Sequence, residues 1–427
     1  MPSFRAPRGT YDILPGDQPY WSFAMRTAAE VASRFGYGRI DTPVFEATDL
    51  FERGVGDATD IVQKEMYTFE DHGGDSMTLR PEGTAGVCRA YIEHGLHNQP
   101  QPVRMYYPAN FFRYERPQAG RFRQFSQFGV EAIGDGSPYV DVEVMELGWS
   151  FVRALNISGA SLRVNSIGDS ECRPAYLDAL RDYYRDHIDD ICDDDRRRLE
   201  RAPLRLLDCK KSQCQSIGDT APKSTDYLCN ACKAHWVLVL ALLEGLKETY
   251  PDLDYYVDHR LVRGLDYYTR TVFEIEPENA AGQSTLLGGG RYDGLIEEIG
   301  GQPTPGIGFA SGLDRLVAHV KSQEDFESPE IGPDVVIVHL GEAAGRRGAS
   351  LAAGLRAAGV AVLVAPAGRS MRAQMRYSNA LNARYALIIG DRELESGEGS
   401  LRPLQEDSGQ AGVSLDVEAI AMAVRGA

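Results

Sequence analysis

The chain has 427 residues and a formal net charge of −17, with 43% hydrophobic and 25% charged residues. This length predicts two or three domains, and the composition is typical of a globular protein rather than a disordered one. No apolar run approaches the ~18 residues of a membrane span. The start, MPSFRAPRGTYDILP, lacks a secretory apolar core, and an odd count of seven cysteines favours a reducing compartment, so we expect a cytoplasmic protein.

In chain order, apolar residues at helical spacing predict a helix over 21–35, which Gly36 closes in a left-handed cap. A strand is predicted over 39–45. Residues 103–133 predict a hairpin whose strands flank the turn PQAGR. Residues 170–250 are mainly helical and interrupt strand-rich sequence on both sides. The pattern predicts an α+β fold, an antiparallel-sheet domain with a helical insertion.

A second domain is predicted after the polar, acidic and proline-containing stretch 321–333, which suits a linker. We expect a first domain over 1–325, a linker over 326–333 and a small α/β domain over 334–427. In the last of these, the apolar runs DVVIVHL, VAVLVAP and YALIIGD alternate with helical spacing, which predicts a mainly parallel sheet.

Charge is unevenly distributed over that second domain. Residues 341–390 contain seven arginines and one acid, whereas 391–420 contain two arginines and eight acids. The overall negative charge argues against a nucleic-acid partner, but a local basic surface is available for RNA. An ordinary solvated face remains the alternative.

The hairpin carries polar residues at alternate positions, so its two strands present polar faces that together suit an anionic, zwitterionic ligand. A solvated sheet face is the alternative. The residues concerned are Arg113 and Glu115 on the first strand, and Arg123, Gln127 and Glu131 on the second. Gln127 and Glu131 are about 13 Å apart on an ideal strand, so they address different ends of the ligand unless Gly129 forms a bulge.

Two glycine-rich segments follow. Three glycines in GGGRYDG indicate the close approach of another backbone or of a flat ligand, and the segment is not a phosphate-binding P-loop. GIGFASGLDRL predicts a strand that runs into a helix, with Ser311 as the N-cap. Arg315 then falls in the first helical turn, where the helix dipole opposes a cation, so an anionic ligand or a salt bridge to an acid such as Asp314 is expected.

A third arginine lies in LVRGLDYYTRTVFE, on a glycine turn before a predicted strand from Tyr268 to Ile275. This residue, Arg263, could converge with Arg113 and Arg315, because all three are adjacent to strands. Guanidinium groups bind phosphate oxygens in a bidentate manner, so the candidate ligand is a polyphosphate.

Four cysteines have a spacing that resembles a zinc ribbon, and four thiolates would form a closed structural Zn²⁺ site. Four reduced thiols are the alternative. The four are Cys209, Cys214, Cys229 and Cys232. Cys88, Cys172 and Cys192 show no partner pattern.

Over nearly its whole length the chain resembles the histidyl-tRNA synthetase family of class II aminoacyl-tRNA synthetases. RGTYDILP is similar to the start of that family, and RIDTP resembles the end of class II motif 1. FRYERPQAGRFRQFSQFGVE is similar to motif 2, and GIGFASGLDRL to motif 3. The histidine-specific resemblance lies in LVRGLDYYTRTVFE and GGGRYDGL.

The resemblance implies a role for each matching residue. Glu82, Thr84 and Gln127 would hold the α-amino end of histidine. Glu131, Tyr267 and Tyr268 would line the imidazole pocket, with Tyr292 nearby. Arg113 and Arg263, the implied catalytic residues, would contact the histidine carboxylate and the α-phosphate of ATP. Glu115 would meet the adenine side, and Arg121 and Arg315 the outer phosphates.

The resemblance also implies a reaction and partners. The activity would be ATP-dependent attachment of L-histidine to tRNA(His) through a histidyl-adenylate, with ATP bound as its Mg²⁺ complex. The α/β domain would read the anticodon, and motif 1 would form a homodimer; no membrane association is expected. Alternatives are a non-catalytic synthetase-like regulatory subunit of histidine biosynthesis, a class II synthetase for another amino acid, and an RNA-binding protein.

Overall fold

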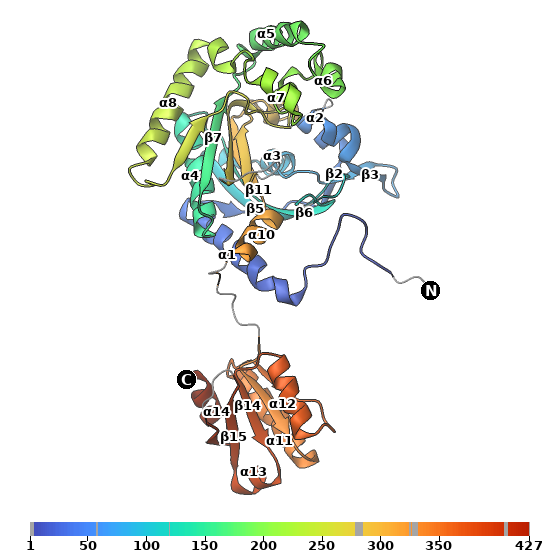
Figure 1. The fold of residues 1–427 in the computed structure, drawn as a ribbon, viewed down its shortest axis with the longest axis vertical. Coiled ribbons are helices and arrows are strands. Elements are labelled where there is room, and N and C mark those ends of the chain that lie inside the picture. The colour runs from blue at the N-terminus through green and yellow to red at the C-terminus, as the bar shows by residue number, and fades with distance from the viewer. Residues whose placement is uncertain are drawn as a thin grey trace. The chain divides into compact units, whose positions relative to one another are not determined.

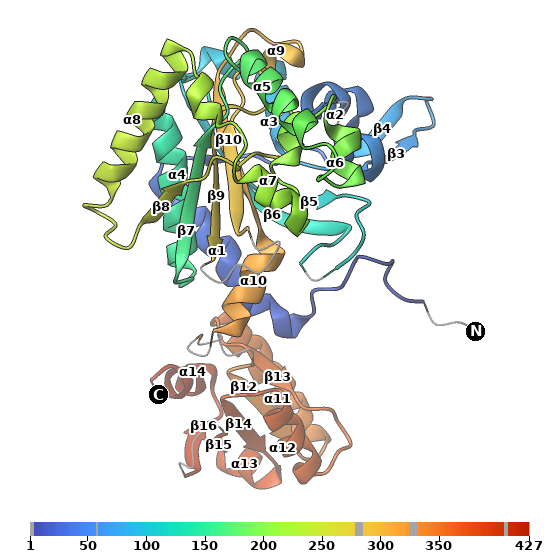
Figure 2. The ribbon, with the colours of Figure 1, turned by 45° about the horizontal axis from the view of Figure 1, so that its top comes forward.

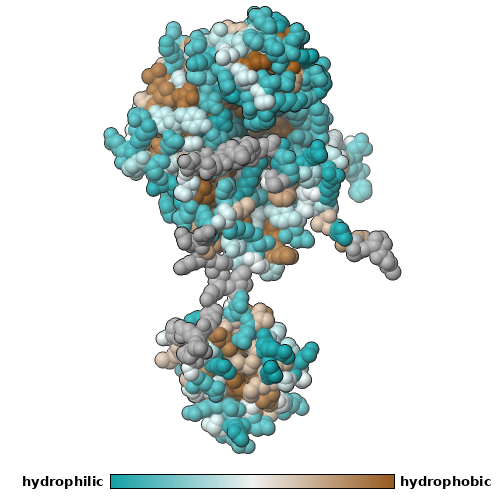
Figure 3. Space-filling model, viewed as in Figure 1, coloured by the Kyte–Doolittle hydropathy of each residue, from teal (hydrophilic) through white to brown (hydrophobic). Residues whose placement is uncertain are grey.

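The computed structural model describes residues 4–56, 59–118, 120–277, 285–323, 326, 332–404 and 409–426. The chain divides into two compact units, Met1–Phe326 and Glu327–Ala427, each with its own sheet and apolar core (Figure 1). Within the described parts of the chain, none of the helices combines the length and the apolar character needed to cross a bilayer. The face drawn in Figure 3 is mainly hydrophilic, with apolar residues in separate patches.

An eight-stranded sheet forms the centre of the first unit (Figures 1 and 2). Its edge pairs β1–β5 and β7–β8 are parallel and the other described neighbours are antiparallel, which confirms the predicted α+β class. In sheet order the strands are β1 (Gly38–Arg39), β5 (Val103–Phe112), β6 (Gln124–Ile133), β11 (Gly306–Gly312), β10 (Leu287–Arg291), β9 (Thr269–Pro277), β7 (Ala160–Ser166) and β8 (Asp254–Val257).

The predicted hairpin is confirmed as β5 and β6. The two strands pair without a register shift, so Gly129 forms no bulge, and Gln127 and Glu131 lie on one face of β6. The prediction that Arg113, Glu115 and Arg123 lie on strand faces is wrong, because all three fall in the connection between the strands.

Long helices cover one face of this sheet and bury the largest apolar core of the unit. They are α1 (Gln18–Arg34), α4 (Pro138–Ala154), α8 (Asn230–Leu246) and α10 (Leu313–Ser322). The helix predicted over 21–35 is confirmed as α1, and Gly36 follows it with a φ of 78°. The predicted N-cap Ser311 is wrong: β11 continues into α10, the cap position is Gly312, and the Ser311 hydroxyl donates to the Leu286 carbonyl.

The strand predicted over 39–45 is broken in two. β1 ends at Arg39 and belongs to the large sheet, whereas β2 begins at Phe45 in a three-stranded sheet. Pro43 lies between them and has no N–H to donate to a ladder. In sheet order the small sheet contains β2 (Phe45–Ala47), β4 (Ser76–Leu79) and β3 (Tyr67–Glu70).

Shorter helices lie beside this sheet and in the predicted insertion. Those near the small sheet are α2 (Thr48–Val55), α3 (Thr84–Glu93) and α9 (Leu295–Glu298). Those of the insertion are α5 (Arg173–Asp186), α6 (Asp193–Arg198) and α7 (Ser212–Gly218), which gather at one end of the unit (Figure 1). The predicted helical segment is confirmed, although its last helix, α8, packs against α4 of the main core.

The second unit is the α/β domain that the apolar runs predict. β12 (Val335–His339) pairs in parallel with β13 (Val362–Val364) and β14 (Tyr385–Ile389). Two antiparallel strands, β15 (Glu398–Pro403) and β16 (Ala411–Ser414), extend the sheet. Its helices are α11 (Glu342–Ala357), α12 (Met371–Ala380), α13 (Asp391–Ser396) and α14 (Val417–Arg425).

Candidate active site

A cavity of about 410 Å³ opens over strands β6, β9, β10 and β11 of the large sheet. The loop between β8 and β9, the connection between β5 and β6, the start of α10 and the insertion residues Asp208 and Lys210 also line it. Six of the predicted site residues line it: Arg113, Glu115, Arg121, Gln127, Arg263 and Arg315. We call this cavity the arginine cleft.

The guanidinium of Arg263 packs directly against Gly288 of β10. The same guanidinium forms an ion pair with Glu274 of β9. A Cβ on Gly288 of β10 would lie 2.4 Å from Nη1 of Arg263, so a larger residue would displace the guanidinium. Burial would lower the pKa of Arg263, but the Glu274 carboxylate outweighs that effect and raises it, which keeps the group charged.

The other two glycines of β10 are explained by backbone contact. A Cβ on Gly289 would lie 2.1 Å from the Gly308 carbonyl oxygen, and one on Gly290 would lie 2.6 Å from the carbonyl oxygen of Thr271. The expected close approach is therefore that of neighbouring strands at these two positions, and of the Arg263 side chain at Gly288.

Arg315 has no acidic partner among the described residues. It donates to the carbonyl oxygens of Gly120 and Thr285, both at 3.1 Å. Asp314, the alternative partner, instead accepts from the Tyr11 hydroxyl and the Ser126 N–H. Burial and then the nearby charge of Arg121 lower the pKa of Arg315, so an anion in the cleft would relieve an uncompensated positive charge.

Arg113 and Arg121 lie on either side of Glu115. Arg121 Nη1 is 3.1 Å from Glu115, whereas the closest approach of Arg113 is 3.9 Å. Arg113 is instead oriented by a bond from Nε to the Pro81 carbonyl (2.8 Å) and by the Phe125 ring, whose centroid is 5.4 Å from its guanidinium carbon. Its terminal nitrogens form no hydrogen bond among the described residues, so a ligand could accept from them.

A second group of predicted residues surrounds the buried carboxylate of Glu131, which is 1% exposed. It accepts hydrogen bonds from the hydroxyls of Thr84 (2.9 Å), Tyr107 (3.1 Å) and Tyr292 (2.6 Å). Burial raises the pKa of Glu131 to about 8, although these hydroxyls favour the charged form. We call Glu131 and its three partners the tyrosine pocket.

Aromatic rings extend the tyrosine pocket. The ring centroid of Tyr267 lies 4.7 Å from that of Tyr268 and 5.9 Å from that of Tyr292. Glu82 lies beside Thr84, where it accepts from the backbone N–H groups of Thr84 (2.7 Å) and Ala85 (2.8 Å) at the start of α3. Burial raises the pKa of Glu82.

Glycines also make room for this pocket. A Cβ on Gly308 would lie 2.0 Å from Oε2 of Glu131, and one on Gly129 would lie 2.3 Å from the Tyr107 ring. Gly129 thus leaves room for the Tyr107 ring, and it forms no bulge. Gln127 lies two residues before it and lines the arginine cleft. Its buried amide oxygen has no hydrogen-bond partner among the described residues, so an N–H of a ligand could donate to it.

Three residues of the site were not predicted from the sequence. Tyr107 bonds Glu131 across the β5–β6 pair, and its position opposite Gly129 follows from the strand register, which the sequence alone does not fix. Glu274 pairs with Arg263, and it is the last residue of the LVRGLDYYTRTVFE segment. Arg163 of β7 lies 3.5 Å from Glu274 and carries no sequence signal.

The predicted grouping of four cysteines is wrong. The structure places Cys209 and Cys214 with Cys192 and Asp195, and it places Cys229 and Cys232 with Cys172 and Asp169. Cys172 and Cys192 therefore do have partners. The missed signal was a mixed spacing, Asp169-x-x-Cys172 and Cys192-x-x-Asp195, in which an aspartate replaces a cysteine.

The basic segment of the second unit is only partly neutralised. Arg346 and Arg384 form ion pairs, and Arg347 and Arg356 bond backbone carbonyls. The remaining three arginines are exposed and form no ion pair among the described residues: Arg369 just before α12, and Arg372 and Arg376 within it.

Comparison with known proteins assigns both units. Residues 9–316 match a family model described as histidyl-tRNA synthetase, and residues 334–425 match an anticodon binding domain. A histidine–tRNA ligase of Dehalococcoides mccartyi is 52% identical over 97% of each chain.

Solved structures agree with this assignment. That of apo S. aureus histidyl-tRNA synthetase is 36% identical, with a TM-score of 0.81 over 99% of each chain. A Bacillus halodurans protein named as an ATP phosphoribosyltransferase regulatory subunit/histidyl-tRNA synthetase is only 23% identical, with a TM-score of 0.65, and it covers 91% of this chain and 98% of its own, so it shows the fold alone. The chain therefore belongs to the histidyl-tRNA synthetase family.

Proposed function

We propose that the protein attaches L-histidine to tRNA(His) in two steps, with ATP entering as its Mg²⁺ complex. The observation that carries this proposal is that a cleft lined by arginines meets a buried cluster of tyrosines that donate hydrogen bonds to a carboxyl group. Gln127 shares the same face of β6 as Glu131 and reaches the cleft, so one small zwitterion can contact both.

In the first step, the histidine carboxylate attacks the α-phosphate of ATP and pyrophosphate leaves. Arg113 and Arg263 are proposed to hold the carboxylate and the α-phosphate, while Arg121 and Arg315 take the outer phosphates. Such a reaction needs positioning and fixed positive charge rather than a covalent enzyme intermediate. The ion pair with Glu274 and the close contact with Gly288 hold Arg263 in place before the substrates bind.

Selection of histidine is assigned to the tyrosine pocket. Glu131, Tyr267 and Tyr268, with Tyr292, would surround the imidazole, and Glu82, Thr84 and Gln127 would address the α-amino end. A pocket whose buried polar groups are completed only by the correct side chain can discriminate by ~10⁴–10⁵ without an editing domain. Leucine or phenylalanine would offer Glu131 no N–H to accept.

In the second step, the terminal ribose hydroxyl of tRNA attacks the adenylate carbonyl and AMP leaves. We propose that Arg369, Arg372 and Arg376 of the second unit bind the tRNA, because they are exposed and form no described ion pair. Replacing all three by alanine should weaken charging and flatten its salt dependence by up to about one unit of slope for each phosphate that is no longer neutralised. Arg346→Ala, at an arginine already paired with Glu342, is the matched control.

We also propose a homodimer in the cytoplasm. The segment 39–43 resembles motif 1, and Val44 and Phe45, which follow it, are 45% and 50% exposed. The seven free cysteines fit a reducing compartment. Light scattering of the purified protein tests the first point, since a monomer at micromolar concentration would contradict it.

The deciding experiment is amino-acid-dependent exchange of labelled pyrophosphate into ATP, measured with each of the twenty amino acids. We expect exchange with histidine and at most trace exchange with the others. Exchange with a different amino acid would replace the assigned substrate. No exchange at all, with a folded chain, would favour the regulatory-subunit alternative.

A further inference from the structure

Six of the seven cysteines gather in two clusters, each of which also contains one aspartate. The Asp169 cluster contains Asp169, Cys172, Cys229 and Cys232, and the Asp195 cluster contains Cys192, Asp195, Cys209 and Cys214. In each, one potential ligand atom per residue lies within 4.8 Å of all the others. We infer that the chain binds two structural Zn²⁺ ions, one in each cluster, through three thiolates and one carboxylate.

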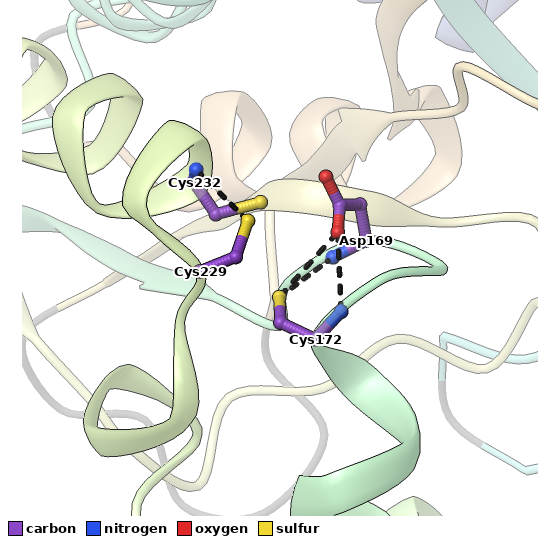
Figure 4. Close-up of side chains that lie close together, drawn as sticks. All are labelled: Asp169, Cys172, Cys229 and Cys232. Atoms are coloured by element: carbon purple, nitrogen blue, oxygen red, sulfur yellow. Dashed lines mark hydrogen bonds between the residues drawn. The ribbon is translucent and has the colours of Figure 1, made fainter.

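The Asp169 cluster joins two segments that each carry two ligands three residues apart. The three sulfurs and the carboxylate face one small space at the starts of α5 and α8 (Figure 4). In one segment the Asp169 N–H donates to the Cys172 sulfur (3.4 Å), and in the other the Cys232 N–H donates to the Cys229 sulfur (3.5 Å). Paired x₂ spacings that meet in this way are typical of zinc ribbons.

The Asp195 cluster has the sulfur spacing of a tetrahedral site. The sulfurs of Cys192 and Cys209 are 4.0 Å apart, and the Cys192 N–H donates to the Cys214 sulfur at 3.3 Å. A tetrahedral Zn²⁺ with bonds of ~2.3 Å to sulfur separates two thiolates by about 3.8 Å. The cluster therefore needs little rearrangement to close around an ion.

The strongest evidence is the aspartate of that cluster. Asp195 is 1% exposed, yet neither of its carboxylate oxygens has a hydrogen-bond partner among the described residues. An isolated buried carboxylate is costly unless it is paired or coordinates a metal. A disulfide between two of the three cysteines would leave both Asp195 and the third thiol unexplained. A cation coordinated by all four satisfies them together.

Zinc is favoured over other cations by the ligand set. Thiolates are soft ligands that Mg²⁺ and Ca²⁺ avoid, and four ligands with no open position indicate a structural rather than a catalytic ion. The two ions would hold the insertion together where its described helices are short: α6 has six residues and α7 has seven.

Both clusters lie next to contacts with the loop that carries Arg263. Arg173, which follows Cys172, donates to the Tyr268 carbonyl at 2.6 Å. Arg205, in the segment before Cys209, donates to the Gly264 carbonyl at 2.7 Å. Zinc would thus fix the histidine-specific loop from the insertion side, although the metal sites themselves do not depend on the proposed aminoacylation.

The test is the metal content of the full-length chain, produced in zinc-supplemented medium and purified under reducing conditions without added metal. We expect two zinc ions per chain by mass spectrometry of the metal. Cys214→Ser and Cys232→Ser should each leave one, and the double variant none. During dialysis against a mild chelator, Asp195→Asn should lose the ion of the Asp195 cluster, whereas the unmodified chain should keep both ions.

Matched controls come from the same segments. Asp193→Asn, on the same helix as Asp195 but with a side chain that is 85% exposed, and Cys88→Ala, outside both clusters, should keep two ions. For variants that fail to fold, thiol titration of the unmodified chain gives a second measurement, in which two zinc ions are released as the six clustered thiols react. A chain without zinc, or one that keeps two ions after loss of either cluster, would overturn the inference.

Discussion

The arginine cleft and the tyrosine pocket meet on β6 but are built by opposite means. The cleft is partly open, and its cations are held by carbonyl oxygens and by single carboxylates such as Glu274. The residues of the pocket are buried, and every described partner of Glu131 is a hydroxyl. A polyphosphate needs excess positive charge, whereas an imidazole needs matched hydrogen-bond partners. The difference indicates that substitutions in the cleft should reduce rate, and those in the pocket should reduce affinity and selectivity.

The largest effect is expected from Arg263→Ala. Removal of one fixed donor to the reacting phosphate typically costs ~10²–10³ in rate, and here it also removes one of the two arginines that pair with Glu274. Histidine-dependent pyrophosphate exchange should fall to near background, with the thermal unfolding midpoint little changed. Arg260→Ala, three residues earlier and paired with Asp219, is the control. Near-normal exchange in the Arg263 variant would refute its assigned role.

A somewhat smaller loss is expected from Gly288→Ala, which keeps Arg263 but moves it. The added Cβ would lie 2.4 Å from the guanidinium, so the group must shift, and a misplacement of about 1 Å can cost ~10²-fold in rate. The expected change is in kcat rather than in KM for histidine. Gly245→Ala, which meets nothing within 4 Å, should behave as the unchanged protein. If both variants are equally active, the contact between Gly288 and Arg263 has no catalytic importance.

Next in size is Glu131→Gln, which acts on the pocket. An amide offers one acceptor oxygen where the carboxyl group has two oxygens, so one buried hydroxyl loses its partner and the imidazole loses an acceptor. A buried polar group left without a partner costs roughly 1–3 kcal/mol, so the KM for histidine should rise by about 5- to 100-fold, with a smaller change in kcat. A rise in KM for ATP alone would contradict the division between pocket and cleft.

The same residue predicts a pH dependence of stability. Because the folded pKa of Glu131 is raised from 4.5 to about 8, the folded state binds more protons than the unfolded state between these values. Its contribution is therefore fully present below about pH 4.5 and is lost as the pH rises through 8. The free energy of unfolding, measured with urea, should fall as the pH rises across this window in the unmodified chain. Glu131→Gln should lack the part of this fall that Glu131 causes.

The smallest effect is expected from Tyr292→Phe. This change removes one of three hydroxyl donors to Glu131 and leaves the ring in place beside Tyr267. A hydrogen bond of this kind contributes about 1 kcal/mol net, so the KM for histidine should rise only several-fold. Tyr256→Phe, whose hydroxyl bonds Glu276 on an exposed part of the sheet, is the control. An effect as large as that of Glu131→Gln would mean that the three donors act as one unit.

Much of this site could be predicted from the sequence, but not its pairings. Strand alternation placed Gln127 and Glu131 on one face, and the positions of Arg113, Arg263 and Arg315 beside strands indicated a common site. Alternation could not show that the chain leaves β5 before Arg113, because aromatic and arginine residues continue without a turn residue. The partners Tyr107 and Glu274 depend on the register between strands, which a single sequence does not fix.

The cysteines are a second case in which the sequence alone does not show which residues lie together. Spacing along the chain grouped Cys209 with Cys232, whereas folding of the insertion recruits Cys192 and Asp195 to one pair and Cys172 and Asp169 to the other. A search restricted to cysteine cannot find a cluster in which one ligand is a carboxylate. The prediction of one four-cysteine site was therefore wrong for two reasons: it considered only cysteine as a ligand, and sequence spacing does not show how the insertion folds.

The two arginine bonds from the insertion to the loop between β8 and β9 end on main-chain oxygens, at Gly264 and Tyr268. Every residue type has a carbonyl, so this support does not depend on which side chains the loop displays. The loop can therefore accept new side chains in evolution or in the laboratory and still be held in place. Attempts to redesign amino-acid preference should accordingly vary Tyr267 and Tyr268 and leave Arg173, Arg205 and Arg263 untouched.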